Sequence, residues 1–321
     1  MPPSRLIRLA RRATRARVPQ LIFAAVALIL MARTENFFKA ATFGSILSLA
    51  SIIGVLAIGQ TFVLIGGGFD LSQGAALALS AAVGASLAVA GWPPYVAGAG
   101  AIGCGLLLGF INGFFVSMVR TNPFVTTLST LLIFRGAAFA LLKGGRLSEI
   151  EAFTILDQGP TILGTLVPWR AFLFPILAAA AWLVLRLTLF GQHVYAVGGN
   201  PQASRLAGIE TRKVTIICYM IGGLAAGIGA IQTLAWLQVA KADLASGYEL
   251  DSIAACVVGG VSLQGGAGSV VGAALGCLFL RSLATLITMS GFPDDYRTIV
   301  TGAVILVFAA ADAFSRDPDS R

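Results

Sequence analysis

Long apolar stretches separated by short polar segments make up most of the chain. The stretches run over about 19–32, 43–65, 71–90, 94–119, 124–142, 171–189, 213–237, 251–264, 267–288 and 296–314. A helix needs about 20 apolar residues to cross a bilayer. The pattern therefore predicts an all-α polytopic membrane protein with about ten transmembrane helices. The stretch at 251–264 is short and rich in glycine, unlike most of the others.

Composition supports a membrane protein. The chain is 57% hydrophobic and only 11% charged, with a mean hydropathy of +0.88, whereas soluble domains carry about 25% charged residues. The formal charge of +8 does not indicate a nucleic-acid partner, because the basic residues lie in short segments beside the apolar stretches. With the N-terminus inside, cytoplasmic segments and their flanks hold thirteen Lys and Arg and external ones hold seven. This bias predicts that both termini are cytoplasmic.

The same pattern predicts one membrane domain with two short tails. Residues 1–17 hold six arginines and no acid and form a basic cytoplasmic tail, residues 18–314 form the transmembrane domain, and residues 315–321 form a second cytoplasmic tail. A basic start followed by a short apolar core is also typical of a signal peptide. We favour an uncleaved first span, because no convincing cleavage site follows and the next apolar stretch begins within about ten residues.

A polar segment at 190–212 interrupts the apolar pattern and is predicted to be a cytoplasmic loop. Asn200 suits an N-cap, Pro201 suits the first helical position and Gly208 suits the left-handed end of a helix. A short helix carrying Arg205 and Leu206 is expected between them. Two interpretations remain: the helix is a capped connector between spans, or it docks on a cytoplasmic motor and transmits its movement.

Polar side chains within the apolar stretches are candidates for a translocation pathway. Asp70 lies near a span end, where Asp70 or Ser72 is expected to cap a helix beginning at about Leu71. Buried charge in a bilayer is costly and usually functional or paired. Asp70 is therefore either a structural cap or ion-pair partner, or a pathway residue. Arg135 is expected to contact either Asp70 or backbone carbonyl groups.

Further polar residues have two interpretations each. Asn112 either hydrogen-bonds a polar solute or binds a neighbouring helix. Thr126, Ser129 and Thr130 are expected to share one helix face, which either lines a polar path or bonds another helix. The same alternatives hold for Gln60 and Gln232. Arg281 is expected to extend its charge to the membrane interface.

Glycine spacing predicts close helix packing. The four-residue spacings that place glycines on one helix face are Gly105, Gly109 and Gly113; Gly268, Gly272 and Gly276; and Gly223 and Gly227. The sequence around Gly67 and Gly68 also has the same spacing of Gly and Leu as the sequence around Gly259 and Gly260. Both segments are expected where a span meets the cytoplasmic side, either as functional helix breaks or by coincidence.

The chain offers few parts for an enzyme. It has one histidine, His193, and four cysteines in apolar stretches without metal-ligand spacing. No lysine follows a glycine, so no P-loop is present. We expect no catalytic residues, no metal and no cofactor, and any ATPase that drives transport is expected to be a separate chain.

Four stretches resemble the permease subunits of ribose-type sugar ABC importers. They are residues 66–74, 112–136, 191–209 and 247–268, within a resemblance running from about 41 to 312. Glu249 and Asp251 match the family pattern, whereas Phe69 and Gln73 depart from it. The residues that fall on the ATPase-coupling loop by this resemblance are Gly199, Asn200, Ala203, Arg205 and Gly208, and Leu206 lies on the same helix.

The resemblance implies a multi-pass permease of the bacterial inner membrane that imports a monosaccharide or related polyol. It implies a second permease copy, two ABC ATPase subunits and a soluble sugar-binding protein as partners, with membrane lipid around the chain and no nucleic acid. The polar side chains considered above supply the candidate pathway residues, Asp70, Asn112, Thr126 and Thr130. The alternatives are an ABC permease for branched-chain amino acids or nucleosides and a self-sufficient ion-coupled transporter.

Overall fold

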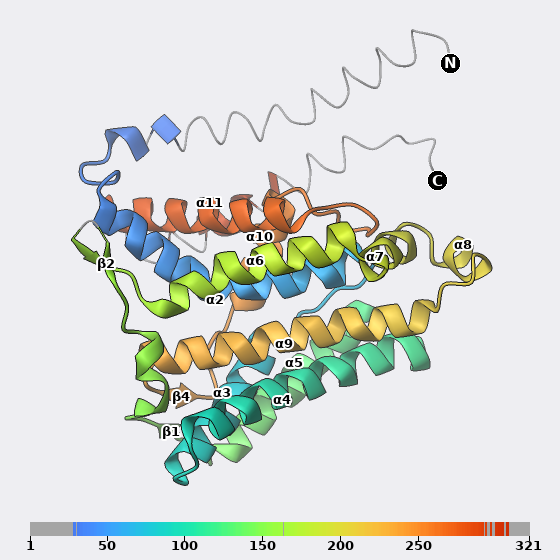
Figure 1. The fold of residues 1–321 in the computed structure, drawn as a ribbon, viewed down its shortest axis with the longest axis horizontal. Coiled ribbons are helices and arrows are strands. Elements are labelled where there is room, and N and C mark those ends of the chain that lie inside the picture. Colours follow the sequence, from blue (N-terminus) through green and yellow to red (C-terminus); the bar gives the residue numbers. More distant parts are fainter. Residues whose placement is uncertain are drawn as a thin grey trace, which may run out of the picture.

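The structure is a computed structural model that describes residues 28–29, 31–162, 164–291, 293, 296, 299–304 and 306–307. Its long helices lie side by side in a bundle (Figure 1). The helices are α2 (Ala40–Ile65), α3 (Gln73–Val89), α4 (Pro94–Phe114) with the π-helical turn η1 (Phe115–Val119), α5 (Pro123–Leu141), the 3-10 helix η2 (Glu151–Leu156), α6 (Trp169–Leu187), α7 (Leu189–Gly199), α8 (Pro201–Leu206), α9 (Thr211–Leu237), α10 (Tyr248–Val258) and α11 (Val270–Met289).

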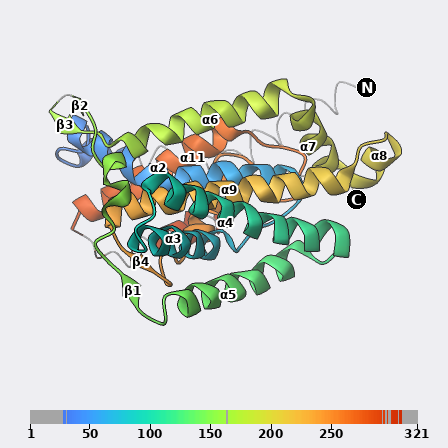
Figure 2. The same cartoon turned by 60° about the horizontal axis from the view of Figure 1, so that its bottom comes forward.

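Two antiparallel strand pairs lie at the end of the bundle opposite α8, as Figures 1 and 2 show. They are β1 (Arg146–Leu147) with β4 (Ala240–Lys241), and β2 (Thr161–Ile162) with β3 (Thr165–Leu166). In the first pair Arg146 lies opposite Lys241, and in the second Thr161 lies opposite Leu166. The bundle therefore has two distinct ends, an α8 end and a strand end.

Seven predicted spans are confirmed as helices, with ends within three residues of those expected. Six helices in the described part of the chain are long and apolar enough to cross a membrane: α2, α4 with η1, α5, α6, α9 and α11. Helix α3 is shorter, at 17 residues. The expected spans at 19–32 and 296–314 lie largely outside the described residues, as do the tails at 1–17 and 315–321.

The predicted span at 251–264 is wrong. Helix α10 has 11 residues and ends at Val258, so it is about 16 Å long, roughly half the thickness of a bilayer core. Gly259 follows it, and Gly260 has a φ of +81°, a conformation that ends a helix. Apolar composition continues to Leu263, but the backbone there is a loop.

Helices α2 and α9 form the centre of the bundle. In their most apolar 18 residues, 61% and 56% are buried, against 28% in α4, α5 and α6. Two hydrophobic clusters share these central helices: one joins them to α6, α10 and α11, and the other joins them to α3 and α4. The outer faces of α4, α5 and α6 keep large apolar side chains exposed, which suits contact with lipid.

The predicted glycine packing is confirmed between α4 and α9. A Cβ atom built on Gly105 would overlap the Gly223 carbonyl oxygen, and one built on Gly109 would overlap the Tyr219 carbonyl oxygen. These two helix backbones can approach so closely because no side chain separates them. Gly272 and Gly276 pack in the same way against α10. Gly268, however, lies in the loop before α11 rather than on its packed face.

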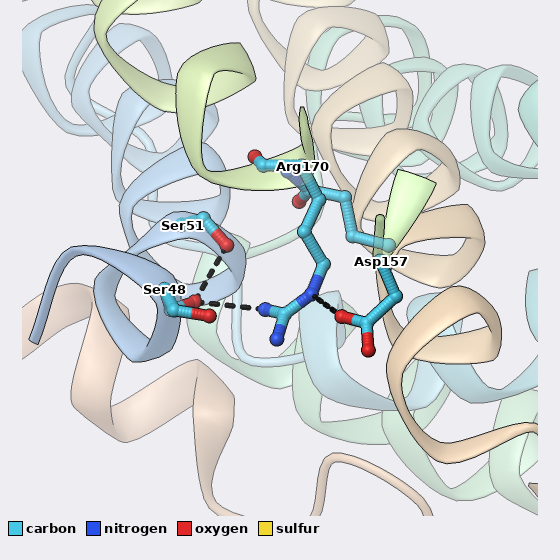
Figure 3. Close-up of polar contacts among 5 residues, drawn as sticks. Ser48, Ser51, Asp157 and Arg170 are labelled. Atoms are coloured by element: carbon cyan, nitrogen blue, oxygen red, sulfur yellow. Dashed lines mark hydrogen bonds and ion pairs between the residues drawn. The ribbon is translucent and has the colours of Figure 1, made fainter. Parts of the chain in front are cut away.

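Arg170 ties several elements together near the strand end, as Figure 3 shows. Its Nε donates to Asp157 Oδ1 at 2.6 Å and its Nη1 donates to the Ser48 carbonyl oxygen at 2.9 Å. The guanidinium also lies over the ring of Trp236, and the Arg170 carbonyl accepts a bond from Gln232 Nε2. The sequence placed Arg170 among external loop cations, whereas only 4% of it is exposed. It joins α2, α6 and α9 to the segment after η2.

We expect Gly223→Ala to lower the free energy of unfolding in detergent by about 1–3 kcal/mol, the usual cost of overpacking a close contact. The added Cβ would overlap the Gly105 carbonyl oxygen and lie 2.8 Å from the Gly109 nitrogen. Gly103→Ala is the matched control, because its Cβ meets nothing within 4 Å. Equal denaturant midpoints for the two variants would contradict this packing.

Candidate functional site

The segment between α6 and α9 contains two helices rather than the one predicted. Helix α7 begins after Thr188, whose Oγ1 accepts a hydrogen bond from the Gly191 nitrogen at 3.2 Å. Its buried residues are Gly191, Val194, Val197 and Gly198, which recur at helical spacing. The sequence analysis missed α7 because its polar residues and glycines resemble a loop, although the Thr188 cap and the spaced valines were a usable signal.

Helix α8 forms as predicted. The Ala203 nitrogen donates to Asn200 Oδ1 at 2.9 Å, which confirms Asn200 as the N-cap, and Pro201 is the first helical residue. Gly208 has a φ of +84°, the left-handed conformation that closes the helix. The helix stands at one end of the bundle, beyond its neighbours (Figure 1).

The sides of α8 differ in their contacts. Ser204 is buried and its hydroxyl donates to the Asn200 carbonyl oxygen at 2.8 Å. Arg205 turns back toward α9, where its Nε donates to Thr211 Oγ1 at 3.0 Å. Leu206 is 91% exposed, more than any other large apolar side chain in the described part of the chain. Gly199 and Ala203 are also exposed, so the six predicted coupling residues lie together.

Clefts flank α8 on both sides. One of about 470 Å³ is lined by residues that include Phe190, His193, Lys213 and Val214. Another, of about 290 Å³, reaches the glycines after α2. The residues that line this second cleft include Gly66, Gly67, Gly68, Arg120, Arg205 and Arg212. The α8 end therefore offers a hollowed, basic surface around an exposed apolar tip.

Three of the four candidate pathway residues are joined in one buried chain of hydrogen bonds. Asp70 Oδ1 accepts from the nitrogen of Ser72 at 2.8 Å and from its hydroxyl at 2.7 Å. Asn112 Nδ2 donates to Ser72 Oγ at 2.7 Å, and Thr130 Oγ1 donates to Asn112 Oδ1 at 2.8 Å. This Asp70 chain links the start of α3 to α4 and α5. Asp70 thus braces the turn before α3, which begins at Gln73 rather than at Leu71.

The predicted polar face of α5 is not uniformly buried. Thr126 and Thr130 are buried, but Ser129 is exposed and Thr127 is buried in its place. Thr126 stands apart from the Asp70 chain: its hydroxyl bonds the Asn122 carbonyl oxygen and the Thr121 hydroxyl. The buried side of α5 therefore includes Thr127 and leaves out Ser129.

Side chains of neighbouring helices satisfy the backbone between α2 and α3. The Phe69 nitrogen donates to Tyr219 Oη at 3.2 Å. The Phe69 carbonyl oxygen accepts from Tyr219 Oη at 3.1 Å and from Thr127 Oγ1 at 3.2 Å. Irregular backbone at membrane depth requires such partners. Sequence reasoning did not identify Tyr219 or Thr127.

A second polar group surrounds the start of α10. Arg135 Nη1 donates to the carbonyl oxygens of Ala242 and Leu244, each at 2.7 Å, so Arg135 contacts carbonyl groups and not Asp70. The Ser252 hydroxyl donates to Gln73 Oε1 at 3.2 Å and joins α10 to the first turn of α3. The two short helices α3 and α10 thus meet through polar side chains at their N-terminal ends.

Arg281 also differs from expectation. It is only 7% exposed and forms an ion pair with Asp251, which links α11 to α10. The sequence predicted that this charge reaches the interface, but it is paired instead with a partly buried carboxylate on the adjacent helix.

Several buried polar atoms near these helices have no hydrogen-bond partner within the described structure. They are both amide atoms of Gln60, Gln73 Nε2 and Glu249 Oε2. Gln232 is only half paired: its Nε2 donates to the Arg170 carbonyl oxygen, whereas its Oε1 has no partner within the described structure. Buried polar groups are nearly always paired, so such exceptions need an explanation. In the described residues no three His, Cys, Asp or Glu side chains gather as metal ligands would.

The chain belongs to the family of branched-chain amino acid transport system permease components, whose model matches residues 42–309. It is 36% identical over 284 residues to the ribose import permease protein RbsC of Escherichia coli strain K12, covering 87% of this chain and 88% of that protein. It is 35% identical over 270 residues to the galactofuranose transporter permease protein YtfT of the same strain, covering 82% and 78%.

A third relative is the xylose transport system permease protein XylH of Haemophilus influenzae, 31% identical over 363 residues and covering 91% of this chain and 96% of that protein. No solved structure matches the chain. Family membership and the six long apolar helices together make this a multi-pass transporter protein of the bacterial inner membrane.

We expect Asn112→Ala to lower the free energy of unfolding by about 1–3 kcal/mol, because it leaves buried Ser72 and Thr130 without their partner. The measurement is chemical unfolding in detergent. Ser129→Ala is the control: Ser129 lies one residue from Thr130 but is exposed, so its change should stay within about 0.5 kcal/mol. An Asn112→Ala protein as stable as this control would show that the Asp70 chain adds nothing to stability.

Proposed function

We propose that this chain is the membrane-spanning permease subunit of an ATP-driven importer for a monosaccharide or related polyol. ATP hydrolysis takes place on separate ABC ATPase subunits, a soluble binding protein delivers the sugar from outside, and a second copy of the chain completes the pore. In this proposal the α8 end faces the cytoplasm and the strand end faces outward. The single membrane domain spans 18–314, with 190–212 as its coupling segment.

The exposed tip of α8 carries the proposal. Leu206 is 91% exposed at the end of a helix whose two ends are fixed by Asn200 and Gly208. An apolar side chain held outward on a capped helix is available for contact with a partner protein. A rigid helix with an apolar tip, flanked by clefts and arginines, suits insertion into a groove on a partner protein. The residues assigned to ATPase coupling are Gly199, Asn200, Ala203, Arg205, Leu206 and Gly208.

The breaks before α3 and α10 support a transport pathway. Short or interrupted helices are a common way to place polar groups for a solute near the middle of a membrane. Here Asp70, Asn112 and Thr130 bond one another between α3, α4 and α5, and we assign them, with Thr126, to the pathway. Gln73 Nε2 and Glu249 Oε2, which have no partner within the described structure, are a donor and an acceptor of the kind that a hydroxyl group binds.

The named relatives favour sugars as the cargo. The three proteins reported above are permeases for ribose, galactofuranose and xylose. The family's description names branched-chain amino acids. The ribose, galactofuranose and xylose permeases, however, are similar to this chain over most of its length. By their names these relatives are permease proteins of import or transport systems, which favours a permease subunit over a self-sufficient ion-coupled transporter.

The first test is purification of the chain in mild detergent, with mass spectrometry of the proteins that accompany it. We expect an ABC ATPase chain, and we expect its ATP hydrolysis to rise when a ribose- or xylose-loaded binding protein is added. A chain that purifies alone and moves a solute along an imposed ion gradient would overturn the proposal.

We expect Leu206→Asp to abolish co-purification of the ATPase while the protein still inserts in the membrane. A charge at this position cannot be buried in an apolar groove without a large desolvation cost. Arg205→Glu should have the same effect, because it reverses a charge and also breaks the bond to Thr211.

The control is Arg146→Glu, which makes the same charge change on exposed β1 at the strand end. It should retain the ATPase. Normal association of Leu206→Asp would show that α8 is not the docking element.

A further inference from the structure

Three separate parts of the chain meet through backbone atoms next to α8. They are the loop after α2, the last turn of α7 and the loop after α10. The Gly266 nitrogen donates to the Ile65 carbonyl oxygen at 2.8 Å, which joins the second loop to the end of α2. The meeting point consists of Gly67, Gly198, Gly265 and Gly266, and we call it the glycine junction.

Three of the four glycines in the glycine junction, namely Gly198, Gly265 and Gly266, have no room for a side chain. A Cβ atom on Gly198 would overlap the Ile65 carbonyl oxygen and lie 2.7 Å from the Gly266 nitrogen. One on Gly265 would lie 2.8 Å from Gly67 Cα and 2.7 Å from the Gly198 carbonyl oxygen. Contact is therefore backbone against backbone, with no flexible side chain to absorb a displacement.

One side chain adds to this contact. Tyr195, one turn before the end of α7, donates from its hydroxyl to the Gly268 carbonyl oxygen at 2.9 Å. Partial burial raises the pKa of Tyr195 above its ordinary value, so the hydroxyl remains a donor throughout the physiological range. Helix α7 is thus held to the loop after α10 at two points.

The residues that form the glycine junction, and Gly268 beside it, are close in sequence to α8, to the Asp70 chain and to the start of α11. Only Gly199 separates Gly198 from Asn200, the cap of α8. Gly67 lies three residues before Asp70, where the Asp70 chain begins. Gly268 lies immediately before Ser269, the residue whose hydroxyl caps the first turn of α11. The three segments thus contact one another beside α8, beside the start of the Asp70 chain and beside the start of α11.

We propose that the glycine junction transmits movement of α8 to the loops after α2 and α10 together. The inference rests on the proposed function, because it supplies the step between ATPase docking and opening of the pathway. The four glycines and Tyr195 act as positioning residues and touch neither sugar nor ATPase. The sequences around Gly67 and around Gly260 share the same spacing of Gly and Leu. This proposal explains the similarity, because the two loops contact each other.

The test compares Gly198→Ala with Gly103→Ala in the complex of permease, ATPase and binding protein, reconstituted in lipid vesicles. Three quantities are measured: ATPase recovery, ATP hydrolysis, and uptake of labelled ribose and xylose. For Gly198→Ala we expect normal ATPase recovery and hydrolysis, but uptake reduced by roughly tenfold. The control, whose Cβ meets nothing within 4 Å, should match the unaltered protein.

Tyr195→Phe is the second variant, because it removes only the hydrogen bond to Gly268 and keeps the ring. We expect uptake per ATP hydrolysed to fall by about threefold, with Tyr95→Phe, an exposed tyrosine at the start of α4, as its control. If Gly198→Ala fails to reach the membrane, the uptake measured for Tyr195→Phe is the test of the glycine junction.

The outcomes separate the two proposals. Normal uptake by Gly198→Ala, or by Tyr195→Phe where the first does not fold, overturns the glycine junction and leaves the importer proposal intact. Loss of the ATPase together with uptake also overturns it, because the glycines would then only hold α8 in place. Absence of an ATPase from the unaltered protein overturns both.

Discussion

The need to satisfy backbone groups inside the membrane governs this structure. A bilayer core offers no water to carbonyl and amide groups, so a chain that leaves the helical conformation there must find partners in the protein. At Phe69 these partners are the hydroxyls of Tyr219 and Thr127. At Ala242 and Leu244 the partner is the guanidinium of Arg135. Each non-helical segment therefore depends on hydrogen bonds with a side chain of another helix. The same hydrogen bonds also hold that helix against the segment.

The same requirement accounts for the positions of most polar residues in the core. Asp70 and Ser72 shape the turn into α3, and Asn112 and Thr130 continue that contact to α4 and α5. Glycine has the opposite role: it removes side chains where backbones meet, between α4 and α9 and in the glycine junction. Hydrogen bonds from polar side chains hold the non-helical segments in place. Close glycine contacts then join the loop after α2 to the loop after α10.

Sequence reasoning succeeded where the signal is local. Apolar runs located seven helices, and Asn200, Pro201 and Gly208 marked both ends of α8, because capping depends on residues within a few positions. It left the answer open where the partner is distant. Arg135 lies 107 residues from Ala242, so spacing alone cannot choose between that carbonyl and Asp70. The span at 251–264 was too long because composition ignores a backbone reversal at Gly260. Ser129 was misplaced because the orientation of α5 follows from packing.

Helix α9 is continuous, whereas the neighbouring path from α2 to α3 is interrupted by a loop. Helix α9 runs for 27 residues, about 40 Å, from Thr211, which holds Arg205 of α8, to the region where Gln232 and Trp236 hold Arg170. The chain from α2 to α3 turns instead at Gly67, whose φ is +80°. The two ends of the bundle are therefore joined along α9 by one uninterrupted set of helical hydrogen bonds, whereas the segment between α2 and α3 is held by side chains of other helices.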